Sequence, residues 1–378
     1  MARHYLDHAS TSALRPEAAA AIGDWLTRGV FADPGRVYEE GRLTAAAVEE
    51  GRLAVAALLQ VDPRQVVFTS GGTEAVNWAN WAARQRDPAA PIALTAVEHS
   101  AVRLSAARGG PAETIPVDSL GRVDLAALDE LLDRPGDRPS LLNCQLANHE
   151  VGTVQPVAEV VRRCREAGVP VHVDACAAAG HLPVDVPALG ADLVSVSAHK
   201  MGGPAGVGAL VVGRGFRPAA LLVGGDQERA RRAGMENVPA IVGFGAVARA
   251  LAAAGALEAE AELARARTDA IAAAALSVPG VVRYGDPTWR LPHIVCFGVA
   301  GVEAEGVVLG LDAAGVAVHS GSACASEAFE PSPVLAAMGV AADHALRCSV
   351  GWSTGEDDVA AFATAFGPVI GRLRALAG

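Results

Sequence analysis

The sequence predicts an α/β protein in which a mainly parallel sheet lies between two layers of helices. Short runs of apolar and β-branched residues recur through residue 212, and stretches with helical periodicity lie among them. Strands that are apolar on both faces and alternate with helices are typical of a parallel sheet covered on both sides. From about residue 239 the pattern changes, which indicates a second, smaller α+β unit.

The strands of the predicted sheet are short apolar runs. They are QVVFTS (65–70), PIALTA (91–96), VPVHVDA (169–175), ADLVSVS (191–197) and VGALVV (207–212). Helices are expected at EAVNWANWAARQ (74–85) and VAEVVRRCREAG (157–168), because apolar residues recur there with a helical period. Strands and helices therefore alternate along this part of the chain.

The second unit is expected after an alanine-rich helix over 246–276, which a glycine interrupts. GVVRYG, HIVCFGV and GVVLGLDAAGVAV follow and have the pattern of a smaller α+β domain. At 378 residues the chain exceeds the usual size of one hydrophobic core. We therefore predict a large domain over 16–253 and a small domain formed by 1–15 and 254–378.

The composition disfavours nonspecific binding to nucleic acid or to an anionic membrane. The chain holds 31 Lys and Arg residues against 42 Asp and Glu residues, a formal net charge of −11. Its amino terminus lacks the apolar core of a secretion signal, and it has no run of about 18 uncharged apolar residues. We expect a cytoplasmic protein, although Arg229, Arg231 and Arg232 form a basic cluster suited to a local anion site.

The cysteines are scattered along the chain as Cys144, Cys164, Cys176, Cys296, Cys324 and Cys348. They form no CxxC pair, so the sequence predicts neither a disulfide framework nor a zinc site, and we expect no bound metal. Most of them are expected in the core. Cys324 differs, because HSGSACASEAFEPSP (319–333) consists of small and turn-forming residues without helical or strand periodicity.

Reactive groups follow the carboxyl ends of the predicted strands, where the sites of open parallel sheets gather. FTSGGTEAVN leads through Gly71, Gly72 and Thr73 into a helix, whose free N–H groups and positive dipole end suit a phosphate. A tight turn with a threonine cap is the alternative, and no GK[ST] follows as in a Walker loop. TAVEHSAV ends a strand at His99, which suits either a structural or a functional histidine.

Two further strand ends carry charged groups. VHVDACAAAG places Asp174 after an apolar strand, where a carboxylate is costly to bury without a cation, although a helix cap is the alternative. SVSAHKMGGPAGVGAL places Ser197, His199 and Lys200 before a glycine-rich turn that offers little to cover a surface side chain. A lysine in such a pocket would have a lowered pKa and attack a carbonyl.

Together these groups indicate one cofactor. A lysine able to form a Schiff base, an acid about 26 residues before it, a stackable imidazole and a glycine-rich phosphate cradle suit pyridoxal 5'-phosphate. Each feature has a structural explanation by itself, but their joint occurrence in this order does not. We predict pyridoxal 5'-phosphate as the cofactor.

The chain resembles the cysteine desulfurases, within the class V aminotransferase group of fold-type I pyridoxal-phosphate enzymes. The resemblance covers nearly the whole chain and rests on YLDHAST, FTSGGTEAVN, VEHSAV, NHEVGTVQPV, VHVDACAAAG, SVSAHKMGGPAGVGAL, GGDQERARRAG, SGSACASEAFEPSPVLAAMG and ALRCSVG. It implies a seven-stranded, mainly parallel sheet in the large domain. It also implies a homodimer whose active sites lie at the subunit interface.

The resemblance implies a role for each matching residue. Lys200 matches the lysine that holds the cofactor covalently, Asp174 the partner of the pyridine nitrogen, and His99 the residue that stacks on the ring and moves protons. Arg347 in ALRCS matches the arginine that pairs with the substrate carboxylate, for which a planar bidentate donor is apt. The residues that match phosphate contacts are Gly72, Thr73, Ser197 and His199.

Cys324 matches the catalytic cysteine, on a loop that spans about residues 318–333. In the family, L-cysteine displaces the lysine from the cofactor, the loop thiolate attacks the substrate sulfur, alanine leaves and a persulfide remains. A sulfur carrier has to reach both the cofactor and an acceptor, which agrees with small residues and weak periodicity. The acceptor is left open among an iron-sulfur scaffold, a tRNA-thiolation protein, a DNA-modification protein and a biosynthetic carrier.

Two departures from the family pattern concern the phenolic oxygen of the cofactor. His149, in NHEVG, replaces an asparagine, and Ala177, in DACAAAG, replaces a glutamine, and both of the replaced side chains donate to that oxygen. A hydrogen bond to a charged acceptor contributes about 1.5–3 kcal/mol. We therefore expect His149 to donate one substitute bond, which leaves the lysine-bound cofactor with a higher pKa than in typical relatives. The alternative is that His149 turns away from the cofactor and packs.

Other departures bear on the substrate. Asp33 stands where an asparagine commonly helps to bind the substrate carboxylate. Two carboxylates at about 4 Å repel by about 4 kcal/mol at an effective dielectric of about 20, so Asp33 is either turned away or paired, or substrate binding differs. Met235 replaces a threonine or serine that reaches the phosphate across a dimer interface, and Trp352 replaces a common arginine after SVG.

Two alternatives to a cysteine desulfurase remain. A selenocysteine lyase or another class V enzyme would keep Lys200 and Asp174 and use a different substrate, although the cysteine loop argues against it. A degenerate scaffold that only binds sulfur-transfer partners would account for the altered residues around the phenolic oxygen.

Overall fold

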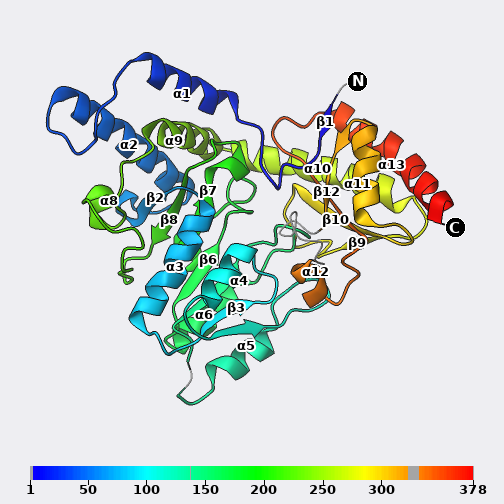
Figure 1. The fold of residues 1–378 in the computed structure, drawn as a ribbon, viewed down its shortest axis with the longest axis horizontal. Coiled ribbons are helices and arrows are strands. Elements are labelled where there is room, and N and C mark those ends of the chain that lie inside the picture. Colours follow the sequence, from blue (N-terminus) through cyan, green and yellow to red (C-terminus); the bar gives the residue numbers. More distant parts are fainter. Residues whose placement is uncertain (1–2, 137, 322–331, 378) are drawn as a thin grey trace.

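The structure, a computed structural model, describes residues 3–136, 138–321 and 332–377. Its central sheet has seven strands in the order β2-β8-β7-β6-β5-β3-β4 (Figure 1). They are β2 (Val66–Thr69), β3 (Ile92–Thr95), β4 (Ala112–Ile115), β5 (Leu141–Gln145), β6 (Val171–Asp174), β7 (Leu193–Ser197) and β8 (Gly208–Val212). β8 pairs antiparallel with both of its neighbours, and the other pairs are parallel. The predicted mainly parallel sheet is confirmed.

Helices cover both faces of this sheet, as the apolar strands predict. On one face lie α3 (Gly72–Arg86) and α4 (Ser100–Ala107). On the other lie α1 (Pro16–Thr27), α2 (Glu39–Leu58), α5 (Leu125–Leu132), α6 (Val157–Glu166), α7 (Val186–Leu189) and α9 (Val238–Ala252). Neighbouring side chains alternate between the two layers: Val67 packs with the first set of helices, whereas Val66 and Phe68 pack with the second.

The sequence pattern misses two strands of the sheet. β4, AETI, lies at the edge with two exposed side chains and therefore lacks an apolar run. β5, LLNCQ, is buried throughout, but Asn143 and Gln145 interrupt its apolar pattern. β5 nevertheless lies inside the sheet between β6 and β3.

A second sheet follows in the chain and has the order β12-β13-β10-β9. Its strands are β9 (Val281–Tyr284), β10 (Ile294–Val299), β12 (His319–Ser320) and β13 (Ala345–Ser349), and it packs with α10 (Ala256–Leu276), α11 (Ala304–Ala313) and α13 (Glu356–Ala377). α12 (Pro333–Ala337) comes before β13. The first residues of the chain join this unit, because β1 (His4–Tyr5) pairs in parallel with β11 (Val316–Ala317).

The alanine-rich segment forms two helices rather than one. α9 ends at Ala252, α10 begins at Ala256, and the two are bent by 83°. Gly255 before α10 has a φ of 77°, a left-handed conformation that glycine adopts at little cost. The break lies at the predicted domain boundary, which itself stays a prediction.

Helix α13 is apolar enough, by length and composition alone, to cross a membrane over Glu356–Leu376, and so is the bent pair of α9 and α10 taken as one span. Such a helix is weak evidence of a membrane span, because core helices pass the same test. In α13 the side chains of Phe362, Phe366, Val369 and Ile370 are at most 1% exposed. They pack in the core of the second unit.

Candidate active site

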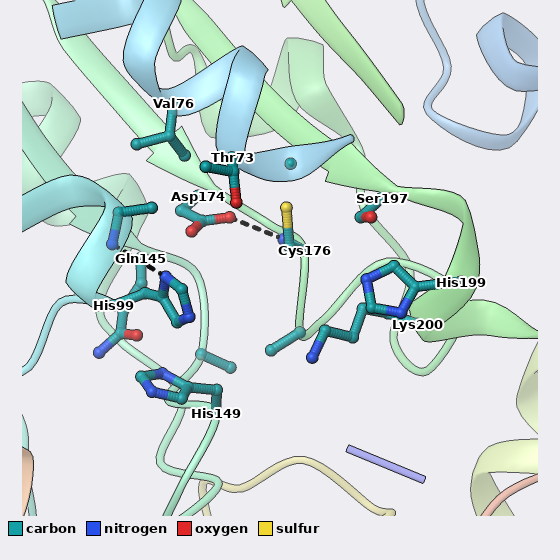
Figure 2. A pocket seen from close by; sticks show the side chains of 14 residues that line it. Thr73, Val76, His99, Gln145, His149, Asp174, Cys176, Ser197, His199 and Lys200 are labelled. Carbon is teal, nitrogen blue, oxygen red and sulfur yellow. Dashed lines mark hydrogen bonds between the residues drawn. The ribbon is translucent and has the colours of Figure 1, made fainter. Parts of the chain in front are cut away.

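A cavity of about 220 Å³ lies at the carboxyl ends of β5, β6 and β7, beside the first turns of α3 and α4. Its lining residues are Gly72, Thr73, Val76, His99, Ala101, Gln145, Ala147, His149, Asp174, Cys176, Ala177, Ser197, His199 and Lys200. Figure 2 shows Lys200 and His199 on one side of it and the rings of His99 and His149 on the other. The strand-end residues predicted from the sequence therefore meet in one pocket.

One end of the pocket is suited to a phosphate. α3 begins there after Gly71, whose φ of 154° favours glycine, and among the described residues no side chain caps its first turn. A Cβ on Gly72 would lie 2.5 Å from the sulfur of Cys176, so only glycine lets the helix approach this closely. The uncapped N–H groups and the dipole of a 15-residue helix favour an anion.

The side chains at this end are short donors and a neutral imidazole. Thr73, Ser197 and His199 line the pocket. Burial and the nearby Lys200 lower the pKa of His199 to about 4, so this ring is neutral at neutral pH. Its Nδ1 lies 3.2 Å from the hydroxyl of Thr11 in the amino-terminal segment.

Asp174 ends β6 and is half-buried in the pocket. Its Oδ1 accepts a hydrogen bond from the backbone N–H of Cys176 at 2.9 Å, and the Ser195 hydroxyl lies 3.4 Å away. Cys176 follows Asp174 by two residues and is half-buried, and the pKa of its thiol is raised well above its ordinary value by desolvation and by this carboxylate. Cys176 is therefore a wall of the pocket and not a thiolate nucleophile.

Lys200 follows β7 on a short 3-10 turn over Ala198–Met201. Its Nζ donates hydrogen bonds to the carbonyls of Ala9 at 2.6 Å and Ser10 at 2.9 Å. Burial, with a contribution from the Arg347 charge, lowers the pKa of Lys200 to about 8. An amine with this pKa is partly neutral at neutral pH and able to attack an aldehyde.

Two histidine rings lie together on the opposite side. His99 caps α4, and its Nδ1 accepts a hydrogen bond from the N–H of Ala101 at 3.1 Å, so the neutral ring carries its proton on Nε2. The rings of His99 and His149 meet edge to face, with centroids 5.0 Å apart. His149 Nε2 lies 3.5 Å from a carboxylate oxygen of Glu150. Ala177 adds a methyl group to the wall and no donor.

Arg347 is not among the pocket-lining residues. It is 1% exposed on β13, and its guanidinium donates to Asp7 Oδ1 at 2.8 Å, Ser10 Oγ at 2.7 Å and the carbonyl of His149 at 2.9 Å. The structure thus gives Arg347 a carboxylate partner from the chain itself. Its pairing with a substrate carboxylate stays a prediction.

The remaining predicted positions lie away from this pocket. Asp33 accepts from the N–H of Gly35 at 2.8 Å, pairs with Arg36 at 3.0 Å, and borders a different cavity, so it is paired as one of the two expectations had it. Met235 is 62% exposed. Trp352 donates its indole N–H to the carbonyl of Ala13 at 2.8 Å. Cys324 and most of its loop lie outside the described residues.

Two polar residues of the pocket, Gln145 and Cys176, were not predicted from the sequence as site residues. Gln145 ends β5 directly beside Asp174 in the parallel register, so the strand-end rule would have found it had β5 been recognised. Cys176 was expected in the core with most of the cysteines, and Cys144, Cys164, Cys296 and Cys348 are indeed buried.

Comparison with known proteins places the whole chain in one family. The model of the family aminotransferase class-V matches residues 4–362. The chain is 38% identical over 364 residues to cysteine desulfurase IscS of Methanosarcina thermophila, which covers 94% of this chain and 89% of that protein. It is 38% identical over 387 residues to a cysteine desulfurase of Cereibacter sphaeroides, with coverage of 100% and 98%. A solved NifS-like protein from Rickettsia africae superposes with a TM-score of 0.88 at 27% identity, covering 97% of this chain and 99% of that one.

Proposed function

This chain belongs to the class-V aminotransferase family, and on that premise we propose that it is a cysteine desulfurase that uses pyridoxal 5'-phosphate to take sulfur from L-cysteine. One observation carries the proposal. Lys200, with a pKa lowered to about 8, shares a single cavity with Asp174, His99 and the uncapped start of α3. These are the groups that an aldehyde, a pyridine nitrogen, an aromatic ring and a phosphate require.

The residues of the pocket fit the cofactor at each of its ends. Asp174 would hold the pyridine nitrogen, and the first turn of α3 with Thr73 and Ser197 would hold the phosphate. Gly72 leaves room for that approach, because any Cβ there meets the sulfur of Cys176. When bound, the cofactor supplies an electron sink that activates the bonds of the substrate at its α and β carbons.

The residues of the chain supply the proton transfers and the sulfur acceptor. His99 faces the pocket with the proton of its neutral ring on Nε2, where it can donate to or accept from bound groups. The thiol of Cys324 takes the sulfur: the carbon–sulfur bond of L-cysteine breaks, a sulfur–sulfur bond forms, and the substrate leaves as L-alanine. The net reaction joins one thiol and L-cysteine to give one persulfide and L-alanine, which balances without an external oxidant or reductant.

An assay of L-alanine and sulfide from L-cysteine tests this function. With an added dithiol that reduces the Cys324 persulfide and releases its outer sulfur as sulfide, the wild type is expected to form both, and Cys324→Ala is expected to lose them. A selenocysteine lyase or another class V enzyme that does not use the thiol would survive that substitution. Sodium borohydride is expected to trap the cofactor on Lys200, and purified protein without a visible cofactor band would instead favour a non-catalytic scaffold.

We also propose that His149 donates to the phenolic oxygen of the cofactor, in place of the donors that relatives carry at positions 149 and 177. It lines the pocket next to His99, and Ala177 leaves space without a donor. A hydrogen bond to the phenolate disperses its negative charge, so it lowers the pH at which the lysine-bound cofactor loses its proton relative to a pocket without a donor; one donor in place of two leaves that pH higher than in relatives. A spectrophotometric titration of His149→Ala is expected to move to higher pH, and an unchanged titration would count against this role.

A homodimer is proposed on the apolar surface beside α2. Phe31, Val37, Val223 and Met235 are exposed by 77%, 86%, 83% and 62%. Phe31 and Val37 lie in the segment between α1 and α2, and Val223 and Met235 lie on either side of α8 (Gln227–Ala230) in the sequence. Residues of these two segments line one cavity. An exposed apolar patch of this kind favours a partner surface. Sedimentation is expected to give twice the chain mass, and a monomer would remove this proposal.

We further propose that the enzyme acts in the cytoplasm and passes the sulfur of Cys324 to an acceptor protein. Support for the site of action comes from the described cysteines, which are free thiols as a reducing compartment would keep them. Following radiolabelled sulfur from the Cys324 persulfide to candidate iron-sulfur, tRNA-thiolation, DNA-modification and carrier proteins would identify the acceptor. Sulfur transfer to proteins of one of these classes is expected, and Cys324→Ala is expected to transfer no sulfur.

A further inference from the structure

A chain of buried polar side chains leads away from Asp174 into the layer between the sheet and helices α3 and α4. Consecutive members lie within hydrogen-bonding distance, and the first has its Oγ 3.4 Å from Asp174 Oδ1. Each member is at most 9% exposed. From the pocket inward, the members are Ser195, His172, Asn143, Asn80 and Ser105.

The sheet register places these side chains on one face. Asp174 is the parallel partner of Ser195, and His172 is the partner of Asn143, so all four point toward α3 and α4. Apolar side chains such as those of Leu141 surround them in this layer. Polar groups buried in an apolar layer cost free energy unless every one is hydrogen-bonded. A chain that continues from strand to helix satisfies that condition.

The direction of the hydrogen bonds is fixed from the far end. The Ser105 hydroxyl lies 2.5 Å from the carbonyl of Ala101, and because a carbonyl only accepts, the hydroxyl donates there. The Ser105 oxygen therefore accepts from Asn80 Nδ2 at 2.7 Å, which turns Asn80 Oδ1 toward Asn143. Asn143 Nδ2 donates to Asn80 Oδ1 at 2.9 Å and lies 3.3 Å from the carbonyl of Ala93.

This direction determines which nitrogen of His172 carries the proton. Asn143 Oδ1 faces His172 Nδ1 at 2.8 Å, so Nδ1 must donate. Burial lowers the pKa of His172 to about 4, against a smaller raising effect of Asp174, so the ring is neutral and Nε2 keeps its lone pair. The Ser195 hydroxyl lies 2.9 Å from Nε2 and donates its single proton there. The oxygen of Ser195, and not its proton, then faces Asp174.

We propose that Ser195, His172, Asn143, Asn80 and Ser105 are positioning residues that set how many hydrogen bonds Asp174 accepts, because they fix the Nδ1–H tautomer of His172 and withhold the Ser195 proton from the carboxylate. A carboxylate that accepts fewer hydrogen bonds binds its remaining donor more strongly. The inference rests on the proposed function, in which that donor is the pyridine nitrogen of the cofactor. The chain also ends on α4, the helix that His99 caps, so it joins two walls of the pocket through the protein interior.

The tautomer can be read directly by ¹⁵N nuclear magnetic resonance of histidine-labelled holoenzyme at neutral pH, with the His172 signals identified by their loss in His172→Gln. Nδ1 is expected to carry the proton and Nε2 to show the shift of an unprotonated acceptor. A proton on Nε2 in the wild type would overturn the proposal. The tautomer is measured whether or not the protein forms alanine from L-cysteine, so failure of the proposed function would be seen separately.

The substitution Asn143→Leu removes the acceptor opposite His172 Nδ1. The His172 proton is expected to move to Nε2, which then donates to Ser195 and releases the Ser195 hydroxyl to Asp174. The visible absorbance titration of the loaded enzyme is expected to shift to higher pH. An Asp174 that also accepts from Ser195 would bind the pyridine nitrogen of the cofactor less strongly, so the cofactor ring would carry less positive charge.

The matched control is Thr268→Val, which removes a buried hydroxyl that donates to the carbonyl of Pro292 at 2.8 Å, far along the chain from the site. It is expected to change neither the tautomer nor the titration. An unchanged His172 tautomer in Asn143→Leu would overturn the proposal. If Asn143→Leu does not fold, the wild-type tautomer decides by itself.

Discussion

Gly72 brings the backbone of α3 against the floor of the pocket. A methyl group there would lie 2.5 Å from Cys176 Sγ and 3.5 Å from Ser197 Cβ. Overpacking of this kind costs about 1–3 kcal/mol, so Gly72→Ala is expected to lower the free energy of unfolding by that amount and to weaken cofactor binding. Denaturant titration and cofactor binding measure the two effects.

The double variant Gly72→Ala with Cys176→Ala is the control for that prediction. Removing the sulfur opens the space that the new methyl group needs, while the 3.5 Å contact to Ser197 is ordinary. Binding and stability are therefore expected to recover together. If the double variant stays as weak as Gly72→Ala, the clash with Cys176 is not the reason.

The pKa of Lys200 gives a pH dependence of stability before the cofactor is bound. Burial lowers this pKa from 10.5 to about 8, so between these values the unfolded chain binds a proton that the folded chain has lost. The contribution of Lys200 to stability therefore rises as the pH rises from about 8 to about 10.5 and is most unfavourable below 8. Lys200→Met is expected to be more stable than the wild type at pH 7, with a gap that closes above pH 10. A constant gap in denaturant titrations would contradict this.

Individual site residues were predictable where one strand end carries them. Lys200, Asp174 and His99 each follow an apolar strand, and parallel strands bring their carboxyl ends to one edge of the sheet. Gln145 was missed because its strand contains polar residues. The engagement of Arg347 by Asp7 could not be predicted, because it joins residues 340 positions apart whose contact depends on the amino-terminal segment folding back onto β13 of the second unit.

At the scale of elements, a buried ion pair attaches α8 to α2. Arg52 Nη2 lies 2.7 Å from Glu228 Oε1, and the side chains are 3% and 1% exposed. Glu228 also accepts from the N–H of Phe68 at 2.8 Å, and Arg52 donates to the carbonyl of Val66 at 2.9 Å, so β2 is included. Glu228 adopts a left-handed backbone with φ 49°, which these bonds stabilise.

Removing one partner of this pair leaves a buried charge. Arg52→Ala is expected to lower the free energy of unfolding by about 3–5 kcal/mol, because Glu228 would remain charged in the core. Arg162→Ala removes an exposed arginine that pairs with Glu159 on α6 and is expected to change stability little. Equal effects of the two substitutions in denaturant titrations would show that burial does not set the cost.

Element boundaries were predictable where the chain changes composition and not where tertiary contacts decide. The strands at 66–69 and 193–197 lie inside the predicted runs. The long alanine-rich pattern predicted continuity from 246 to 276, with an interruption, and the structure places the break at 253–255 with a bend of 83°. That angle follows from packing α9 on the large sheet and α10 on the second unit, which local pattern does not contain.

At the scale of the molecule, buried histidines are expected to make the fold sensitive to acid. Burial lowers the pKa of four of them to about 4 and that of His293 well below its ordinary value, whereas an unfolded histidine titrates at 6.5. Between pH 6.5 and about 4 the unfolded chain binds more protons, so stability is present above this range and is lost as the pH falls through it. The buried histidines with lowered pKa values are His8, His172, His181, His199 and His293.

Glu98 acts in the opposite direction over part of that range. Burial raises its pKa from 4.5 to about 7, so the folded chain keeps a proton that the unfolded chain releases, and this contribution falls as the pH rises from 4.5 to 7. The five histidines together outweigh this single carboxyl group. Denaturant titrations are expected to show a net loss of stability from pH 7 to pH 4, and replacement of His181 by Gln is expected to reduce that loss.

The amino-terminal segment contacts both units. Its carbonyls at Ala9 and Ser10 hold Lys200, its Asp7 holds Arg347, and its strand pairs with residues near 316. During synthesis these first residues leave the ribosome long before their partners exist. The active site therefore closes only after nearly the entire polypeptide has been translated, and a nascent chain arrested before residue 347 cannot carry a finished catalytic centre.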